Sequence, residues 1–417
     1  MSTTNICYNS ELVAGFLNVR PHNIWKVNKV KIGQAPKLAL TFLLLFQVVS
    51  IVIAPAGHYY QITSFGTIVY ETLPLHVEGR LLKDPFNNTV YLRGIAKPRF
   101  AEDPTGCWAM SGEVGDGAGW MNWRSAAVAA NLDAMLEWGA NVVRINTCVE
   151  YWKFDVDNHR QHIKDLAQMC SERGMYLIYC AWNIQGGDSQ FISGILPYPP
   201  HHSRTHIIAN EQEFVDYWVS VAEELKDYPN VIFEIWNEAG GEMQSSVSER
   251  DHYFDVVVDV IIGIRNVTDH LCLAQWGYGA GPSFNLQVWL EDLKNDWIDA
   301  SNLTNVAYVT HLYDDMYGGS GSSYEQVKAR LQSDKIEWAV ATLQVPLIIT
   351  ETSADVRYGY EQAWSNALTI LNEWNISYTG WWWRQNAYAL LQDDQPWIPG
   401  PTLIGQILID SIAAGQD

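Results

Sequence analysis

Basic side chains are scarce in this sequence. Lysine and arginine number 26 against 47 aspartates and glutamates, so the formal net charge is −21 over 417 residues. Proteins that bind nucleic acid need basic patches that neutralise phosphates. The shortage of such groups excludes nucleic acid as the expected partner and fits a neutral or polyhydroxylated ligand better.

Cysteine motifs and phosphate-binding turns are also missing. The six cysteines are scattered without a C-x-x-C pair, which excludes a zinc-finger type of site and a disulfide framework, although one or two bridges stay open. No G-x-G-x-x-G turn follows a predicted strand, which argues against an open, doubly wound sheet. Low-complexity segments are absent as well, so the chain is expected to be globular.

The N-terminus carries the longest apolar run. Leu38 to Ala54 is uncharged and follows a basic flank that includes Arg20 and Lys37. Such a pattern predicts export with the N-terminus left inside, as a cleaved signal peptide or as a membrane anchor through residues 38–56. We therefore expect 1–56 to be this segment, 57–74 to be a linker, and 75–417 to be a catalytic domain that is extracellular or anchored facing outside.

Two short apolar runs each end on a glutamate. Val231-Ile-Phe-Glu-Ile-Trp-Asn-Glu238 and Leu347-Ile-Ile-Thr-Glu351 both read as buried strands. Carboxylates that follow buried strands are candidates for acid, base or nucleophilic chemistry. The alternative is that Glu238 and Glu351 are capping or salt-bridged groups.

Strands and helices alternate along residues 75–417. A hairpin around Asp84 to Asn88 is expected to lead into the first of eight strands. The other strands are expected at about 141–146, 175–182, 231–238, 271–276, 306–313, 346–351 and 377–384, with helices at 124–138, 157–173, 211–226, 247–265, 286–294, 323–342, 359–374 and 402–414. Strict alternation implies parallel strands, so we predict an α/β fold, a (β/α)8 TIM barrel with an N-terminal β-hairpin.

In such a barrel the carboxyl ends of all strands face the same way, which brings Glu238 and Glu351 together. Arg144 interrupts an apolar strand and needs a buried anion, for which one of these glutamates is the expected partner; a structural ion pair elsewhere is the alternative. Held beside Arg144, Glu351 would stay ionised, while Glu238 in a more apolar setting would hold a proton. His311 and Tyr313 share one face of their strand, either at this site or as satisfied core groups.

These motifs together resemble glycoside hydrolase family 5, the cellulase type of clan A, over about residues 75–415. The resemblance rests on the motifs Leu92-Arg-Gly-Ile95, Arg144, Asn237-Glu238, His311-x-Tyr313, Thr350-Glu351 and the tryptophans 381–383. It implies that Glu238 is the acid/base and Glu351 the nucleophile.

The resemblance also implies supporting roles. Asn237 would bind the sugar 2-hydroxyl, Tyr313 and Arg144 would flank the nucleophile, and Trp383 would lie under the reacting sugar. Two positions depart from the family pattern: Ala239 replaces the usual proline, and Trp182 stands where the third strand usually ends on histidine.

The expected function is therefore a retaining β-glycoside hydrolase that cleaves β-1,4-linked polysaccharide, with endo-β-1,4-glucanase as the first choice. β-Mannanase and exo-β-glucosidase are the alternatives among enzymes, and a carbohydrate-binding pseudoenzyme is the alternative of another class. The expected partner is a polysaccharide or oligosaccharide substrate. No metal and no cofactor are implied.

Overall fold

The computed structural model describes residues 51–53, 58–62, 68–97, 125–155, 158–182, 210–238, 247–276, 286–383, 390 and 400–415. The chain divides into two compact units, and the larger one comprises Val52–Tyr60 and Val69–Asp417. The described helices and the barrel strands all belong to this larger unit.

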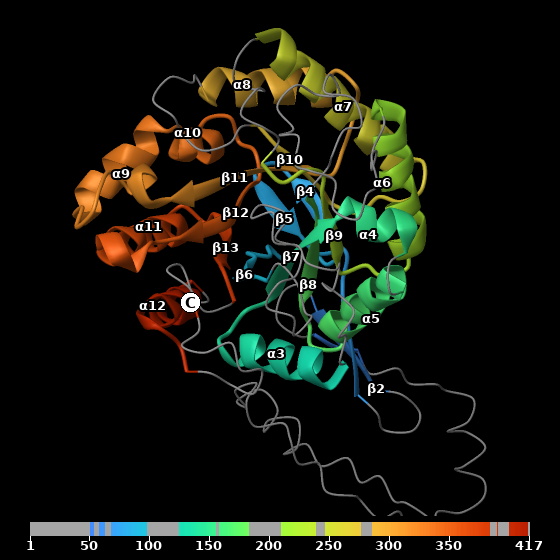
Figure 1. The fold of residues 1–417 in the computed structure, drawn as a ribbon, viewed down its shortest axis with the longest axis horizontal. Coiled ribbons are helices and arrows are strands. Elements are labelled where there is room, and N and C mark those ends of the chain that lie inside the picture. The colour runs from blue at the N-terminus through green and yellow to red at the C-terminus, as the bar shows by residue number, and fades with distance from the viewer. Residues whose placement is uncertain are drawn as a thin grey trace, which may run out of the picture. The chain divides into compact units, whose positions relative to one another are not determined.

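Eight parallel strands form a closed barrel in the order of the sequence (Figure 1). They are β6 (Arg93–Ala96), β7 (Val142–Cys148), β8 (Tyr176–Trp182), β9 (Val231–Glu234), β10 (Cys272–Gln275), β11 (Val306–Tyr313), β12 (Leu347–Ser353) and β13 (Ser377–Trp381). β13 pairs with β6 and closes the ring. The predicted (β/α)8 barrel is therefore confirmed.

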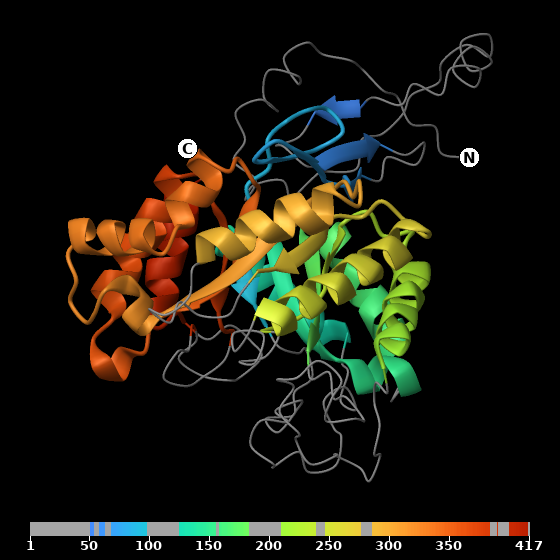
Figure 2. The same cartoon turned by 90° about the horizontal axis from the view of Figure 1, so that it is seen from above.

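Helices surround these strands, as Figures 1 and 2 show from two directions. They are α3 (Ser125–Glu137), α4 (Val149–Phe154), α5 (His159–Ser171), α6 (Glu211–Leu225), α7 (Val247–Arg265), α8 (Leu286–Asp292), α9 (Tyr324–Ser333), α10 (Ile336–Ala341), α11 (Glu361–Glu373) and α12 (Leu403–Ala414). The π-helix η5 (Leu293–Asp299) continues α8, and two 3₁₀ turns, η6 (Asp314–Tyr317) and η7 (Val356–Tyr358), follow β11 and β12.

The single helix expected over 323–342 is divided into α9 and α10. Lys335 lies between them with a φ of 66°, a left-handed conformation that a continuing helix cannot contain. α9 itself begins with a capping box, in which Ser323 and Gln326 satisfy each other's backbone amides.

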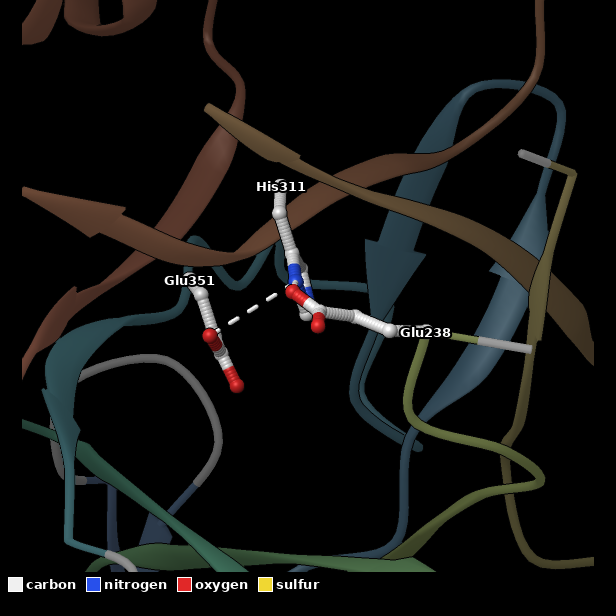
Figure 3. A group of neighbouring side chains, drawn as sticks. All are labelled: Glu238, His311 and Glu351. Atoms are coloured by element: carbon white, nitrogen blue, oxygen red, sulfur yellow. Dashed lines mark hydrogen bonds and ion pairs between the residues drawn. The ribbon is translucent and has the colours of Figure 1, made fainter. Parts of the chain in front are cut away.

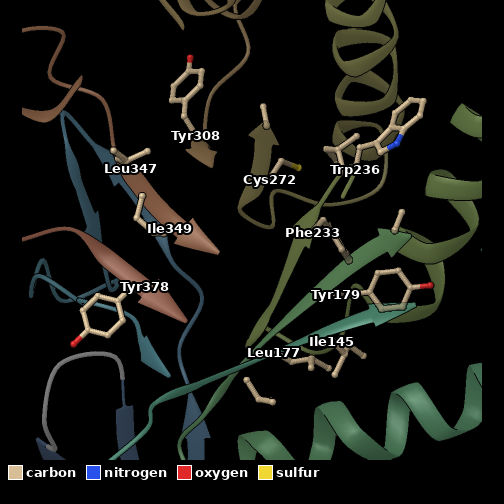
Figure 4. Packing of buried hydrophobic residues seen from close by; sticks show 14 of the residues in the cluster. Ile145, Leu177, Tyr179, Phe233, Trp236, Cys272, Tyr308, Leu347, Ile349 and Tyr378 are labelled. Atoms are coloured by element: carbon tan, nitrogen blue, oxygen red, sulfur yellow. The ribbon is translucent and has the colours of Figure 1, made fainter. Parts of the chain in front are cut away.

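Each barrel strand is buried on both faces because it separates two apolar layers. One layer lies between strands and helices and includes Tyr179, Phe233 and Tyr378 (Figure 4). The other fills the barrel interior with Ile178, Ile232, Leu273, Val309 and Ile348. Strand side chains alternate between these two layers, which explains the continuous apolar runs seen in the sequence.

Glycine 94 permits the close pairing of the first two barrel strands. A Cβ at this position would lie 1.9 Å from the carbonyl oxygen of Val142, so a larger residue would push β7 away from β6. This close approach explains why the Leu92-Arg-Gly-Ile95 motif has glycine at its third position. The neighbouring Arg93 lies with its guanidinium 4.6 Å from the ring centroid of Tyr378 on β13.

The N-terminal hairpin differs from the prediction in the position of its turn. β4 (His76–Glu78) and β5 (Leu81–Lys83) pair antiparallel around Gly79 and Arg80. The expected turn at Asp84 to Asn88 is a second one, in which the Asp84 carboxylate accepts hydrogen bonds from two backbone amides, and Lys83 pairs with Thr89 across it. Leu75 and Leu82 join the interior apolar layer of the barrel.

Strands also occur before the hairpin. β1 (Ile51–Ile53), β2 (His58–Ile62) and β3 (Ile68–Thr72) form a three-stranded sheet, so the stretch interpreted as a linker contains two strands. Most of the apolar run that predicts a signal peptide or anchor, residues 38–50, lies outside the described residues. Among the residues that are described, no helix has the length and hydropathy that crossing a bilayer requires.

Candidate active site

Glu238 lies four residues beyond the end of β9. Ile235 still donates its backbone amide to Leu273 of β10, but Asn237 donates to Ala181 of β8 instead. The chain therefore leaves the β9–β10 ladder here, and Glu238 adopts a φ of 48°, which is uncommon for a residue with a side chain. This turn presents the Glu238 carboxylate at the carboxyl ends of the strands.

A register shift in β12 aims Glu351 into the barrel. Thr310 of β11 pairs with Ile349, but His311 pairs with Glu351, so Thr350 is an extra residue. Ordinary alternation would place Thr350 and Glu351 on opposite faces, whereas a bulge lets both point inward. The Thr350 hydroxyl donates to Glu234, and Glu351 reaches Arg144.

Arg144 is fully buried and connects two carboxylates. Its Nε and Nη2 donate to the two carboxylate oxygens of Glu234 at 2.6 and 2.8 Å, and Nη1 donates to Oε1 of Glu351 at 2.5 Å. Asn146 and Asn237 accept further hydrogen bonds from the guanidinium. Arg144 does meet Glu351, as the sequence predicts, but its bidentate partner is Glu234.

The sequence analysis missed Glu234. A carboxylate inside the apolar run Val231-Ile-Phe-Glu234 is the same signal that singles out Arg144 in its own strand, and a buried carboxylate requires a partner. Each of these charged residues lies within an apolar strand of its own, and pairing Glu234 with Arg144 would have predicted their contact.

Glu351 is held in its ionised form. Its side chain is 5% exposed, and burial by itself would raise its pKa. His311, Arg144 and a hydrogen bond from the Tyr313 hydroxyl outweigh burial, so the pKa of Glu351 lies below its ordinary value. The Tyr313 hydroxyl lies 2.6 Å from Oε2 of Glu351. Burial, followed by the charges of the two glutamates, raises the pKa of Tyr313 far above its ordinary value, so Tyr313 remains a donor.

His311 lies between the two glutamates (Figure 3). Its Nδ1 is 2.7 Å from Oε1 of Glu238 and 3.6 Å from Oε2 of Glu351. Burial would lower the pKa of this imidazole, but the charge of Glu351 and the hydrogen bond to Glu238 outweigh it, so the pKa of His311 is raised. An imidazole placed in this way orients the Glu238 carboxyl group and shares its proton.

The exposure of the two glutamates is the reverse of what we expected. The Glu238 side chain is 29% exposed and that of Glu351 only 5%. The expectation of a more apolar setting for Glu238 was therefore wrong, because the turn after β9 carries Glu238 away from the strand and the bulge in β12 keeps Glu351 inside.

Glu238, His311 and Glu351 each contribute one side-chain atom to a group in which all atoms lie within 4.8 Å of one another. These are atoms that could hold a divalent metal. However, His311 Nδ1 already faces Glu238, and the two oxygens of Glu351 already accept from Arg144 and Tyr313. A metal would have to displace these partners and sit near a guanidinium cation, so the arrangement suits acid, base and nucleophilic chemistry better.

The tryptophans at the end of β13 and directly after it are placed differently from the prediction. Trp383 is buried in the layer between strands and helices, where its indole donates to Asn131 and packs edge-on against Trp138 at 4.7 Å. It therefore does not join the group of carboxylates. Trp381 shares a strand face with the inward Thr379, is half-buried, and stacks on Trp382 with ring centroids 5.1 Å apart.

The remaining predicted residues fall at the same ends of the strands. Asn237 lies directly before Glu238 with its amide oxygen held by Arg144, and Trp182 is the last residue of β8, paired with Cys148 of β7. Cys180, which no sequence pattern singled out, lies 3.2 Å from the Arg144 guanidinium, and burial raises the pKa of its thiol. Among the described cysteines, Cys170, Cys180 and Cys272 are free.

Comparison with solved structures shows the same barrel in enzymes that act on β-glycans. The β-glucanase SdGluc5_26A of Saccharophagus degradans is 17% identical over 83% of this chain and 95% of its own, with a TM-score of 0.60. Endoglucanase Cel5A of Thermobifida fusca is 19% identical over 81% and 97%, with a TM-score of 0.55. A β-mannanase of Streptomyces thermolilacinus is 15% identical over 82% and 94%, with a TM-score of 0.52. At these identities the likeness establishes the fold.

Comparison with curated protein sequences gave no match. The sequence pattern of one family, described as cellulase (glycosyl hydrolase family 5), matches residues 101–387. This match covers more than half of the chain and includes both glutamates, Arg144, His311 and Tyr313. On this pattern, and in agreement with the resemblance of its motifs, the chain belongs to glycosyl hydrolase family 5.

Proposed function

We propose that this glycoside hydrolase cleaves β-1,4-linked polysaccharide with retention of configuration, and that it is an endo-β-1,4-glucanase. Glu351 acts as the nucleophile and Glu238 as the acid/base. The observation that carries the proposal is the short separation of the two carboxylates, whose nearer oxygens lie within 4.8 Å of each other. Retaining enzymes hold their carboxyl groups about 5–5.5 Å apart, and inverting enzymes about 6.5–9.5 Å apart.

The surroundings of each glutamate support its role. Glu351 accepts hydrogen bonds from Arg144 and Tyr313, which hold it as an anion with a fixed orientation. Glu238 is the more exposed carboxyl and lies against His311, so it can exchange a proton with a leaving group and with water. A nucleophile must be ionised and an acid/base must change its protonation state, and the two environments differ in this sense.

The reaction proceeds in two displacements. A Glu351 oxygen attacks the anomeric carbon and forms a glycosyl ester, while Glu238 gives its proton to the departing glycosidic oxygen. Glu238, now a carboxylate, then removes a proton from water, whose oxygen attacks the same carbon and releases Glu351. The proton returns to Glu238, so the enzyme is regenerated after one bond is hydrolysed.

The choice of glucan rests on the net charge of the chain and on the relatives. A net charge of −21 favours a neutral substrate over an anionic one. The two glucanases are described as such in their solved structures, and the S. degradans enzyme has also been solved in complex with cellotetraose. Mannan is the second candidate because the Streptomyces enzyme, which has the same fold, is a β-mannanase.

A small substrate panel tests the proposal. The enzyme would be incubated with soluble β-1,4-glucan, β-1,4-mannan and an aryl β-glucoside, with the Glu351→Gln variant as the inactive control. We expect internal cleavage of the glucan, seen as a rapid fall in viscosity before much reducing sugar appears. Preferred cleavage of mannan would identify a β-mannanase, and cleavage of the aryl glucoside alone would indicate exo action. Binding of glucan without any hydrolysis would contradict an enzymatic role.

A further inference from the structure

Two buried polar groups, one on β10 and one on β11, have no hydrogen-bond partner in the part of the chain that is described. One is the side-chain amide of Gln275, the last residue of β10, which is 1% exposed and has neither its oxygen nor its nitrogen satisfied. The other is Nε2 of His311, which is fully buried, while Nδ1 of the same ring faces Glu238. Buried polar atoms are nearly always paired in folded proteins, so these two require an explanation.

The strand register places them on the same side of the barrel wall. Gln275 is directly opposite Val309 of the neighbouring strand β11, and both Val309 and Leu273 belong to the interior apolar layer. Gln275 therefore points into the barrel, and so does His311, two residues after Val309. With strands about 4.8 Å apart and about 3.3 Å of rise per residue, the two backbones are about 8 Å apart along this diagonal. The two side chains do not hydrogen-bond each other in this structure, so a contact between them requires a change of the Gln275 rotamer or one bridging water.

The backbone around Gln275 also leads to Glu238. The amide of Asn237 would continue the ladder to the carbonyl of Gln275, but it donates to Ala181 instead. The Gln275 carbonyl accepts from the Tyr253 hydroxyl at 3.0 Å. Gln275 thus stands where β9 separates from β10 and where the turn that carries Glu238 begins.

We propose that Gln275 is a positioning residue, which binds Nε2 of His311. Through the imidazole ring, Gln275 controls whether Nδ1 accepts the proton of the Glu238 carboxyl group or donates hydrogen to the Glu238 carboxylate. A primary amide suits this task because it has an acceptor end and a donor end. When Nε2 carries hydrogen, the amide oxygen accepts it, and Nδ1 can accept the proton of the acid form of Glu238. When Glu238 is the base, Nδ1–H donates to its carboxylate, and the amide NH₂ donates to Nε2.

This role deepens the proposed function and rests on it for the assignment of Glu238 as the acid/base. Other charged and titratable groups face His311 and set the background for its protonation. They come from β7, the turn after β9, β11 and β12, and are Arg144, Glu238, Tyr313 and Glu351. From β10 the group that faces the ring is the neutral Gln275, so Gln275→Met changes the hydrogen bonding without changing the charge.

Two substitutions with opposite expected effects test the proposal. Gln275→Glu, when ionised, leaves only acceptors and adds a negative charge, both of which stabilise hydrogen on Nε2, so the alkaline limb of the kcat/KM profile should move up by about one pH unit. Gln275→Met is similar in size but gives Nε2 no strong partner, so the alkaline limb should move down. The control is His270→Leu, which removes a buried side chain with an unpartnered atom near the other end of the same strand. It should leave the profile unchanged.

A second measurement does not depend on turnover. Nitrogen NMR of ¹⁵N-histidine-labelled enzyme, with the His311 signals identified by their loss in His311→Gln, reports which ring nitrogen carries hydrogen. We expect His311 to keep hydrogen on Nε2 to higher pH in Gln275→Glu than in the wild type, and to lower pH in Gln275→Met. Because this readout needs no substrate, it remains decisive if the enzyme fails to cleave glucan.

The proposal is overturned if folded Gln275→Glu leaves the His311 titration where it is in the wild type. It is also overturned if the two Gln275 variants move the alkaline limb in the same direction. The same holds if His270→Leu moves the alkaline limb as far as a Gln275 variant does. Should Gln275→Met not fold, the opposite-sign comparison is replaced by Gln275→Glu against His270→Leu with the same NMR readout.

Discussion

Replacing Arg144 by methionine isolates the contribution of the buried ion network. The side chains of Arg144 and Glu234 are fully buried and that of Glu351 is 5% exposed, so the substitution leaves two carboxylates without their cation. Removing one partner of a buried ion pair costs about 3–5 kcal/mol, much of it from the charge left behind. We expect a loss of unfolding free energy in that range, measured by chemical denaturation near pH 7, together with a loss of most glucanase activity.

The pH dependence of this loss has a definite sign. In the wild type the pKa of Glu351 is lowered, so its contribution to stability is present above its ordinary pKa and disappears as the pH falls through the lowered value. Without Arg144, burial is opposed only by His311 and Tyr313, so the pKa of Glu351 is higher in the folded variant than in the folded wild type, and the variant gains its proton at a higher pH. The deficit of Arg144→Met relative to the wild type should therefore shrink as the pH falls from about 7 to about 5.

Two further variants separate charge from packing. Arg173→Met removes a partly exposed arginine that pairs with Asp133, and should cost about 1 kcal/mol or less. Adding Glu234→Gln to Arg144→Met removes one of the two stranded charges and should restore part of the stability but not the activity. The reasoning fails if Arg144→Met loses no more stability than Arg173→Met, or if the added Glu234→Gln destabilises further.

Three other expectations concern single features. Trp383→Ala should lower the unfolding free energy by about 3–5 kcal/mol because it leaves a cavity in a packed layer. Trp381→Ala should mainly raise KM for oligosaccharides. Equal effects of the two variants on KM would contradict the different placement of Trp381 and Trp383. Tyr313→Phe removes a hydrogen bond that lowers the pKa of Glu351, so the acid limb of the pH–rate profile should move to higher pH; an unchanged limb would exclude this role. The basic flank before residues 38–54 predicts that the catalytic domain lies outside the cytoplasmic membrane. Cell fractionation tests this prediction, and intact, soluble, full-length chain in the cytosol would contradict it.

The barrel could be predicted because its signal is repeated eight times. Each strand is a short apolar run, each helix has an apolar stripe, and one misplaced boundary does not change the alternation. The paired glutamates followed from the same logic, since barrel strands present their carboxyl ends together. The break at Lys335 and the position of the hairpin turn were not predictable in this way, because both depend on single backbone conformations.

Details of the site needed three-dimensional information. The register shift that lets Thr350 and Glu351 point the same way has no signature in Leu347-Ile-Ile-Thr-Glu351. The choice between Trp381 and Trp383 depends on where β13 ends and which of its residues face inward, and three successive tryptophans carry no alternation to show it. By contrast, Glu234 could have been found, because a lone carboxylate in an apolar strand needs a buried cation as much as Arg144 needs an anion.

The most direct test of the central claim is the stereochemistry of azide rescue. With an activated aryl β-glycoside, Glu238→Ala should still form the glycosyl-enzyme, and azide, which needs no base, should release it as the β-glycosyl azide after two inversions. Glu351→Ala leaves space for azide to attack the substrate itself and should give the α-glycosyl azide after one inversion. Proton NMR of the two products distinguishes them. The opposite assignment of products would show that the roles of Glu238 and Glu351 are reversed, and an α-product from both variants would contradict a glycosyl-enzyme intermediate.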